Sequence, residues 1–289
     1  MSTDPRTAEF LNRLRVDPQS DGSFAGTCYP AWPGRAFGGQ LAAQSLQAAF
    51  NARQDEALKP WSLHMHFLAP VRANSRIDYH VEMLKEGRSV SSRQVLIRQN
   101  GKLCGTALAL FATSLPGPEH QYRRPDAPRP ESIPPEERLI HPTIVPLDAD
   151  FDDLGYPAES LIELRVAEPD DGPASDEVTF ERKAWMRVVP QLPDDPMTTA
   201  STLSYFSDIT LGTTALTPHG GRSQTTDLQL GAVELALWFT GPIDVSDWVL
   251  FVQDSLFAGR GHGLAHGVFY NAAGAVSGLA VQNALLRNR

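Results

Sequence analysis

The chain has 289 residues, 42% of them hydrophobic, which is enough to bury the cores of about two ordinary domains. Its formal charge of -9, with no block of lysine or arginine to override it, excludes nucleic acid as a partner. Two cysteines, no signal-peptide core and no apolar run of membrane-span length predict a cytoplasmic protein without a membrane partner.

The first half reads as one helix followed by a meander of strands. Small and apolar residues recur at helical spacing after the pair Gly38-Gly39, which predicts a helix to about Phe50. The dipeptide Asn100-Gly101 favours a two-residue hairpin turn. Alternating or β-branched runs predict strands over residues 61–68, 76–84, 89–98 and 102–111.

A proline-rich segment then interrupts this pattern. Prolines recur among charged residues from Pro116 to Pro142, and the acidic stretch 168–173 has a similar composition. We therefore expect an N-terminal domain over 1–115, a linker and excursion over 116–175, and a C-terminal domain over 176–289.

The second half repeats the order of the first. The pattern predicts a helix over 198–216 and strands over 178–189, 228–239, 248–257, 263–270 and 275–286. Glycines and small residues of the segment 101–109 fall in register with those of 274–282. The fold class is therefore expected to be α+β, with two fused units, each a helix wrapped by an antiparallel sheet.

Six strings resemble the acyl-CoA thioesterase II family in the family's order. They are residues 36–40 (AFGGQ), 62–68 (SLHMHFL), 86–93 (EGRSVSSR), 204–208 (SYFSD), 237–239 (LWF) and 281–283 (VQN). The resemblance covers nearly the whole chain outside the linker. It implies a double hotdog fold and a role in lipid metabolism. The implied reaction is the hydrolysis of a fatty acyl-CoA substrate to free acid and CoA, with no metal or other cofactor. Acyl chain length and association into a homo-oligomer stay open.

The resemblance also implies how the catalytic water is held. The family uses an aspartate, a serine or threonine hydroxyl, and a glutamine, which fall on Asp208, Ala232 and Gln282 of this chain. A carboxylate can accept a proton from water while an amide orients it. Because Ala232 has no hydroxyl, two hypotheses stand: a slow or re-tuned thioesterase, or an acyl-CoA binding protein with a degenerate site.

Asp208 and Gln282 also have structural interpretations, as a capping or surface acid and as an outward-facing glutamine. Asp208 lies in an apolar segment, where a charge usually needs a partner or a function. The first-half equivalent of Gln282 is Ala109, so the two copies differ there. Both observations favour function.

His64 and His66 alternate with apolar residues and therefore share one strand face. A zinc pair lacks a third ligand with suitable spacing, so hydrogen-bonded histidines near the helix are the favoured structural interpretation. Both histidines are also candidate catalytic residues. His66 departs from the family's aromatic residue, and we expect it near the pocket as a supplementary base or hydrogen-bond donor. Thr225 and Thr226 are further candidates to assist.

Five residues are candidates to bind CoA. Gly38 and Gly39 precede a helix, whose first N–H groups can bind a thioester oxygen or a phosphate, although a tight turn explains glycines equally well. Arg88, Arg93 and Arg260 are candidate phosphate contacts, and each is alternatively an ordinary solvated arginine.

Overall fold

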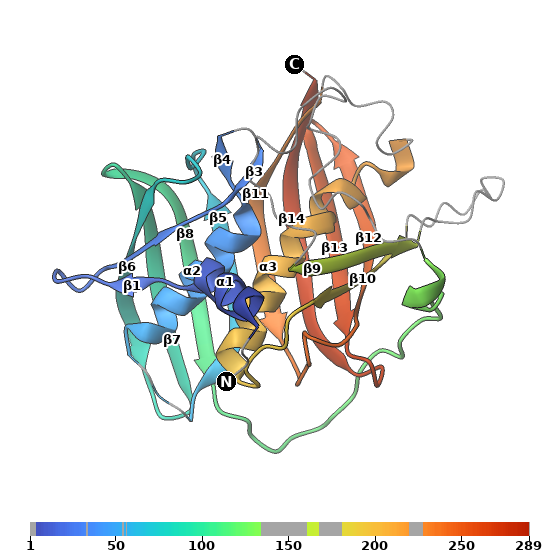
Figure 1. The fold of residues 1–289 in the computed structure, drawn as a ribbon, viewed down its shortest axis with the longest axis horizontal. Helices are drawn as coiled ribbons and strands as arrows, with labels where there is room; N and C mark the ends of the chain where they lie inside the picture. Colours follow the sequence, from blue (N-terminus) through green and yellow to red (C-terminus); the bar gives the residue numbers. More distant parts are fainter. Residues whose placement is uncertain are drawn as a thin grey trace.

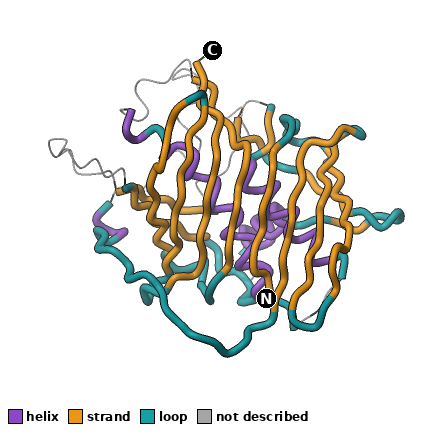
Figure 2. Tube along the Cα trace, turned by 180° about the vertical axis from the view of Figure 1, so that it is seen from behind, coloured by secondary structure: helices purple, strands orange, loops and turns teal. Residues whose placement is uncertain are grey.

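The computed structural model describes residues 4–32, 34–53, 55, 57–133, 161–167, 181–219 and 228–288. Within these ranges a 12-stranded antiparallel sheet carries three helices on one face (Figure 1). Seen from behind, the strands pass in front of the helices (Figure 2). The helices are α1 (Pro5–Leu14), α2 (Gly38–Asn51) and α3 (Pro196–Thr214). None of the described helices is long and apolar enough to cross a membrane.

The sheet follows the order β1-β2-β6-β7-β8-β5-β11-β14-β13-β12-β10-β9. Its first half consists of β1 (Asp17–Pro18), β2 (Phe24–Thr27), β5 (Lys59–Phe67), β6 (Arg76–Glu86), β7 (Val90–Gln99) and β8 (Lys102–Ala112). Its second half consists of β9 (Ile162–Ala167), β10 (Arg182–Val188), β11 (Leu228–Phe239), β12 (Val249–Gly259), β13 (His262–Tyr270) and β14 (Val276–Asn288). A separate hairpin joins β3 (Pro30–Trp32) to β4 (Arg35–Ala36), and short 3₁₀ turns span Pro130–Ser132 and Thr217–His219.

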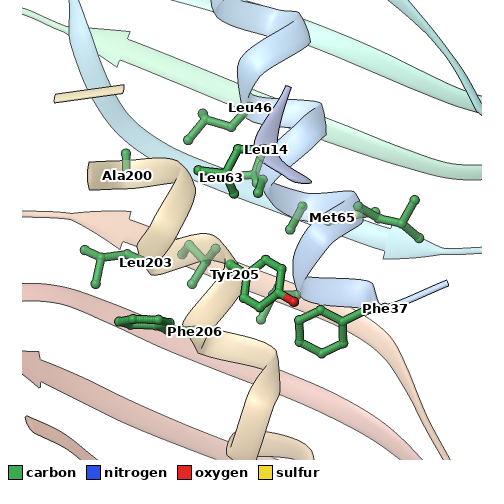
Figure 3. Packing of buried hydrophobic residues seen from close by; sticks show 14 of the residues in the cluster. Leu14, Phe37, Leu46, Leu63, Met65, Ala200, Leu203, Tyr205 and Phe206 are labelled. Carbon is green, nitrogen blue, oxygen red and sulfur yellow. The ribbon is translucent and has the colours of Figure 1, made fainter. Parts of the chain in front are cut away.

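The two halves share one core because β5 pairs with β11 at the centre of the sheet. Leu63 lies opposite Leu237 and Met65 lies opposite Leu235, and all four side chains are buried under the helices. Figure 3 shows Leu63 and Met65 in this layer together with residues of α2 and α3. The two sequence repeats therefore form one continuous apolar layer rather than two separate cores.

Helix α3 lies at the centre of the molecule and is buried almost all round. Its many serine and threonine hydroxyls are accommodated because several donate to carbonyls three or four residues earlier, as Thr202 and Ser204 do. Buried hydroxyls that are hydrogen-bonded in this way do not carry the cost of an unsatisfied polar group. A helix so enclosed can carry a functional side chain into the interior.

The predicted helices and strands are present, and the structure adds elements that were not predicted, among them helix α1, the short strands β1 to β4 and strand β9. Helix α1 was not predicted from its sequence, although Asp4 caps it by accepting from the N–H of Arg6. Strand β9 lies inside the segment 116–175 and pairs with β10, so the interpretation of that segment as linker and excursion is wrong for residues 162–167. A six-residue strand bordered by acidic, proline-bearing sequence has too little periodic signal of its own.

Candidate active site

Asp208 is a buried carboxylate held between the two long helices and the last strand. It lies in the second half of α3, with 8% of its surface exposed. Its Oδ2 accepts from the backbone N–H of Gly39, in the first turn of α2, at 2.9 Å. Its Oδ1 accepts from Nε2 of Gln282 on β14 at 2.5 Å. Two residues expected to hold the water are thus in direct contact.

Burial changes the acid–base properties of Asp208. Removal from water raises the pKa of Asp208 from 3.8 to about 6, while the hydrogen bonds from Gln282 and Gly39 lower it and keep it from rising further. The positive end of the α2 dipole also favours the anion. Above about pH 6 the carboxylate is ionised. Its pKa is closer to pH 7 than that of an exposed aspartate, so it is a stronger base.

Gln282 is 1% exposed and has one polar atom without a partner among the described residues, the carbonyl Oε1. The orientation of the amide follows from chemistry, because an ionised carboxylate only accepts hydrogen bonds and Nε2 must therefore face Asp208. A buried acceptor left in this state usually has a water or ligand as its partner.

The glycine pair is required by close packing. A Cβ on Gly38 would lie 2.6 Å from Oδ2 of Asp208, and one on Gly39 would lie 2.5 Å from the carbonyl oxygen of Tyr205. Figure 3 shows the turn of α3 at Tyr205 beside Phe37, which precedes the pair. Because the N–H of Gly39 is used by Asp208, the prediction that it binds a thioester oxygen or phosphate is wrong. Gly38 stays a candidate.

A cavity of about 320 Å³ opens beside Asp208 and Gln282. Its other walls come from the start of α2, the end of β5 and the start of β11. Ala232 lies in this wall, opposite Ala284 of β14 and next to a bulge in β11. The position at which the resemblance implies a hydroxyl therefore presents a methyl group to the same cavity.

A larger cavity of about 880 Å³ lies at the other end of the sheet, around the start of α3. Three of its carboxylates, Asp195, Asp244 and Asp247, accept hydrogen bonds from backbone N–H groups of their own turns. Such acids stabilise local backbone structure. The smaller cavity is the better candidate because it contains the buried carboxylate and the unpartnered amide oxygen.

His64 and His66 share a face, as expected, but it is the face turned away from the helices. Their neighbours Leu63 and Met65 are buried in the core, and alternation puts both imidazoles on the outside. The His66 side chain is 62% exposed beside Glu234, and His64 packs edge-on against Trp238. The expectation that His66 lies near the pocket is wrong. Among the described residues no cluster of three potential metal ligands is found.

The predicted arginine contacts have three different outcomes. Arg93 is buried and donates to the carbonyl of Phe50 at the end of α2, so its assignment to CoA is wrong. Arg88 precedes β7, and the first residue of β7 aligns through β8 with the start of β5. The candidate pocket lies at the end of β5, so Arg88 lies at the opposite end of the sheet from the pocket. Arg260 precedes β13 at the pocket end of the sheet.

Sequence reasoning missed Arg35, which lines the pocket at the β3–β4 hairpin. It forms a backbone bridge with Arg72, and both arginines are exposed. No local pattern distinguishes these arginines from other surface arginines. Thr225 and Thr226 lie outside the described residues.

Comparisons with known proteins match both halves. A family model described as the acyl-CoA thioesterase N-terminal domain matches residues 29–112, and one described as acyl-CoA thioesterase matches 161–284. The chain is 27% identical over 278 residues to acyl-CoA thioesterase 2 of Haemophilus influenzae, covering 96% of each chain.

Solved structures show the same fold. The crystal structure of an acyl-CoA thioesterase II from Mycobacterium marinum has a TM-score of 0.80 and 27% identity, covering 96% of this chain and 98% of that one. A protein with a hot dog fold from Alicyclobacillus acidocaldarius has a TM-score of 0.72 at 19% identity, covering 97% and 98%, and bears on the fold alone. The expected double hotdog is confirmed, and the chain belongs to the acyl-CoA thioesterase II family of thioester hydrolases.

Proposed function

We propose that this chain hydrolyses fatty acyl-CoA thioesters to the free acid and CoA, using a water activated by Asp208 and oriented by Gln282. The observation that carries the proposal is the buried Asp208 carboxylate, with a pKa of about 6, in contact with Gln282 at the wall of a cavity. Such a perturbed acid beside unpaired polar atoms is the pattern expected of a catalytic base.

The proposed step needs no covalent enzyme intermediate. Asp208 takes a proton from water as the water oxygen bonds to the thioester carbonyl carbon. The carbon–sulfur bond then breaks, and the proton held by Asp208 passes to the departing CoA thiolate. Gly38 lines the same cavity, and its N–H, the first of α2, is proposed to donate to the developing oxyanion.

The alternative is an acyl-CoA binding protein with a degenerate site, and the methyl group of Ala232 is the observation that favours it. Thiol release from acyl-CoAs of graded chain length, measured beside equilibrium binding of the matching non-hydrolysable thioethers, separates the two. Release that depends on Asp208 supports hydrolysis. Tight binding without release would support the alternative. The absence of both release and binding would contradict both functions.

The CoA phosphates are proposed to bind at Arg35, which lines the cavity, with Arg72 bridged to it and Arg260 at the same end of the sheet. This location places cations at the mouth of the cavity, although the whole chain has a charge of -9. A local cluster of guanidinium groups is sufficient to hold phosphates on an acidic protein.

Replacing Arg35 with alanine is expected to raise KM for acyl-CoA about fivefold, because an exposed guanidinium–phosphate contact contributes roughly 1 kcal/mol. KM for the same acyl group on N-acetylcysteamine, which has no phosphates, should not change. Arg88→Ala, at the far end of the sheet, is the matched control. An equal loss with both substrates would show that Arg35 does not act through phosphate.

We also propose that the chain forms a homo-oligomer through the outer face of the sheet. Leu108 stays 47% exposed there, and Trp238 lies on the same face because its neighbour Leu237 is buried. Light scattering should give a mass above 31.6 kDa, and Leu108→Glu should reduce it. A monomer at micromolar concentration would contradict this.

A cytoplasmic location is part of the same proposal, because both cysteines are free thiols, as expected in a reducing compartment. Recovery of the native protein from any other cell fraction would contradict it.

A further inference from the structure

Residues that were not expected to act in the reaction also line the cavity, and Gly212 is one of them. It follows Asp208 by four residues in α3, so both face the same side of the helix. A Cβ placed on Gly212 would lie 3.0 Å from Oε1 of Gln282, the buried acceptor that has no partner among the described residues.

Space, rather than backbone conformation, explains this glycine. Gly212 is absent from the glycines with positive φ, so its backbone is one that alanine adopts readily. Glycine in the interior of a helix is less favourable than alanine. Glycine therefore stands in place of a better helix former at the position where a methyl group would crowd Oε1 of Gln282.

The distance from Gln282 Oε1 to a methyl group at residue 212 would be close to that of a hydrogen-bonded water. A water that donates to an oxygen acceptor lies about 2.7–2.8 Å from it, and the hypothetical methyl carbon of residue 212 would lie 3.0 Å from the same Oε1. A methyl carbon so close to Oε1 would block the approach of a donor from this side and would supply no hydrogen. Because Nε2 of Gln282 is bound to Asp208, Oε1 is the atom of this amide that is free to accept from water.

We propose that Gly212 is a positioning residue, which keeps open the place of a water held by Oε1 of Gln282 beside the carboxylate of Asp208. The inference rests on the proposed hydrolysis and adds a requirement to it. Placement of the water then depends on the absence of a side chain at residue 212, one helix turn after Asp208, as well as on Asp208 itself. The contact with Gln282 Oε1 would thus orient the water in part, although Ala232 supplies no hydroxyl.

The test is Gly212→Ala. We expect kcat toward acyl-CoA to fall about 100-fold, the lower end of the range seen when one oxyanion-hole hydrogen bond is lost. KM and the affinity for a non-hydrolysable acyl-CoA thioether should stay within about twofold. Alanine is accepted in a helix, so the variant should fold, and a thermal melt checks this. A general packing defect would instead weaken binding and lower the melting temperature.

Thr213→Ala is the matched control in the next position of α3. The Thr213 hydroxyl accepts from Arg182 and donates to the carbonyl of Thr210, away from Gln282. This variant also introduces an alanine and disturbs the helix more, yet we expect it to keep the wild-type kcat. A wild-type kcat in Gly212→Ala, or an equal fall in both variants, would overturn the inference.

A readout independent of turnover separates this inference from the proposed function. High-resolution crystal structures should show an ordered water within hydrogen-bond distance of Gln282 Oε1 in the wild type and none there in Gly212→Ala. If the wild type released no thiol, the proposed hydrolysis would fail while this comparison still tested the role of Gly212. A water that remains in the alanine variant would contradict that role directly.

Discussion

Replacing Asp208 with asparagine is expected to lower kcat for thiol release by about 10²- to 10⁴-fold, the usual contribution of a general base. The fold should survive, because the asparagine carbonyl can accept from Gly39 and Gln282 can turn its amide to accept from the new N–H. Equilibrium binding of a non-hydrolysable thioether should be retained. A fall of less than tenfold in a folded variant would remove Asp208 from the chemistry.

The pH profile provides the internal check on this result. Since burial raises the pKa of Asp208 to about 6, wild-type kcat should be level above that pH and fall about tenfold per pH unit below it. The residual activity of Asp208→Asn should lack this limb. A wild-type profile that titrates near pH 4 would show that the carboxylate is solvated when substrate is bound.

The raised pKa of Asp208 makes stability fall as pH rises, whereas activity increases over the same range. The folded state holds its proton more tightly than the unfolded state, whose pKa is near 3.8, so stability is lost as pH rises from about 4 to about 6. A difference of about two pKa units corresponds to roughly 3 kcal/mol. The free energy of unfolding of Asp208→Asn, measured relative to wild type, should rise across that pH range. A constant difference would contradict the raised pKa.

Ala232→Ser is expected to raise kcat about tenfold with little change in KM. The substitution adds one oxygen to the cavity wall near Asp208, where overpacking should be modest. A hydroxyl that helps to hold the water acts mainly in the transition state, and such interactions change kcat more than KM.

Two controls define that second result. Asp208→Asn in the Ala232→Ser background should abolish the gain, because the two residues would act on one water. Gly212→Ala in the same background tests whether the new hydroxyl can replace the water contact at Gln282. An unchanged or lower kcat in a folded Ala232→Ser protein would indicate that this chain orients water without a group at position 232.

The sequence by itself determined the elements and their order. The helix after Gly38-Gly39, the helix that carries Asp208 and the strands of both halves are visible because helix and strand periodicities depend on near neighbours. The repeat of 101–109 in 274–282 predicted two similar units, and the quoted strings predicted the family. Helix α1 and strand β9 were missed because their length and flanking residues gave weaker local signals.

Only the tertiary structure decided which side chains meet. Alternation put His64 and His66 on one face, but an isolated strand does not distinguish the core face from the outer one, and packing of Leu63 and Met65 under the helices decided it. Arg93 was indistinguishable from a surface arginine until the end of α2 covered it.

The site itself depends on contacts between distant parts of the chain. Asp208 is separated by 74 residues from Gln282 and by 169 from Gly39, and it contacts both because α2, α3 and β14 pack against one another. The raised pKa of Asp208 comes from that burial, which no local pattern encodes. The sequence therefore specified the chemical groups, and packing determined their environment and partners, because desolvation and hydrogen bonding depend on distance in space.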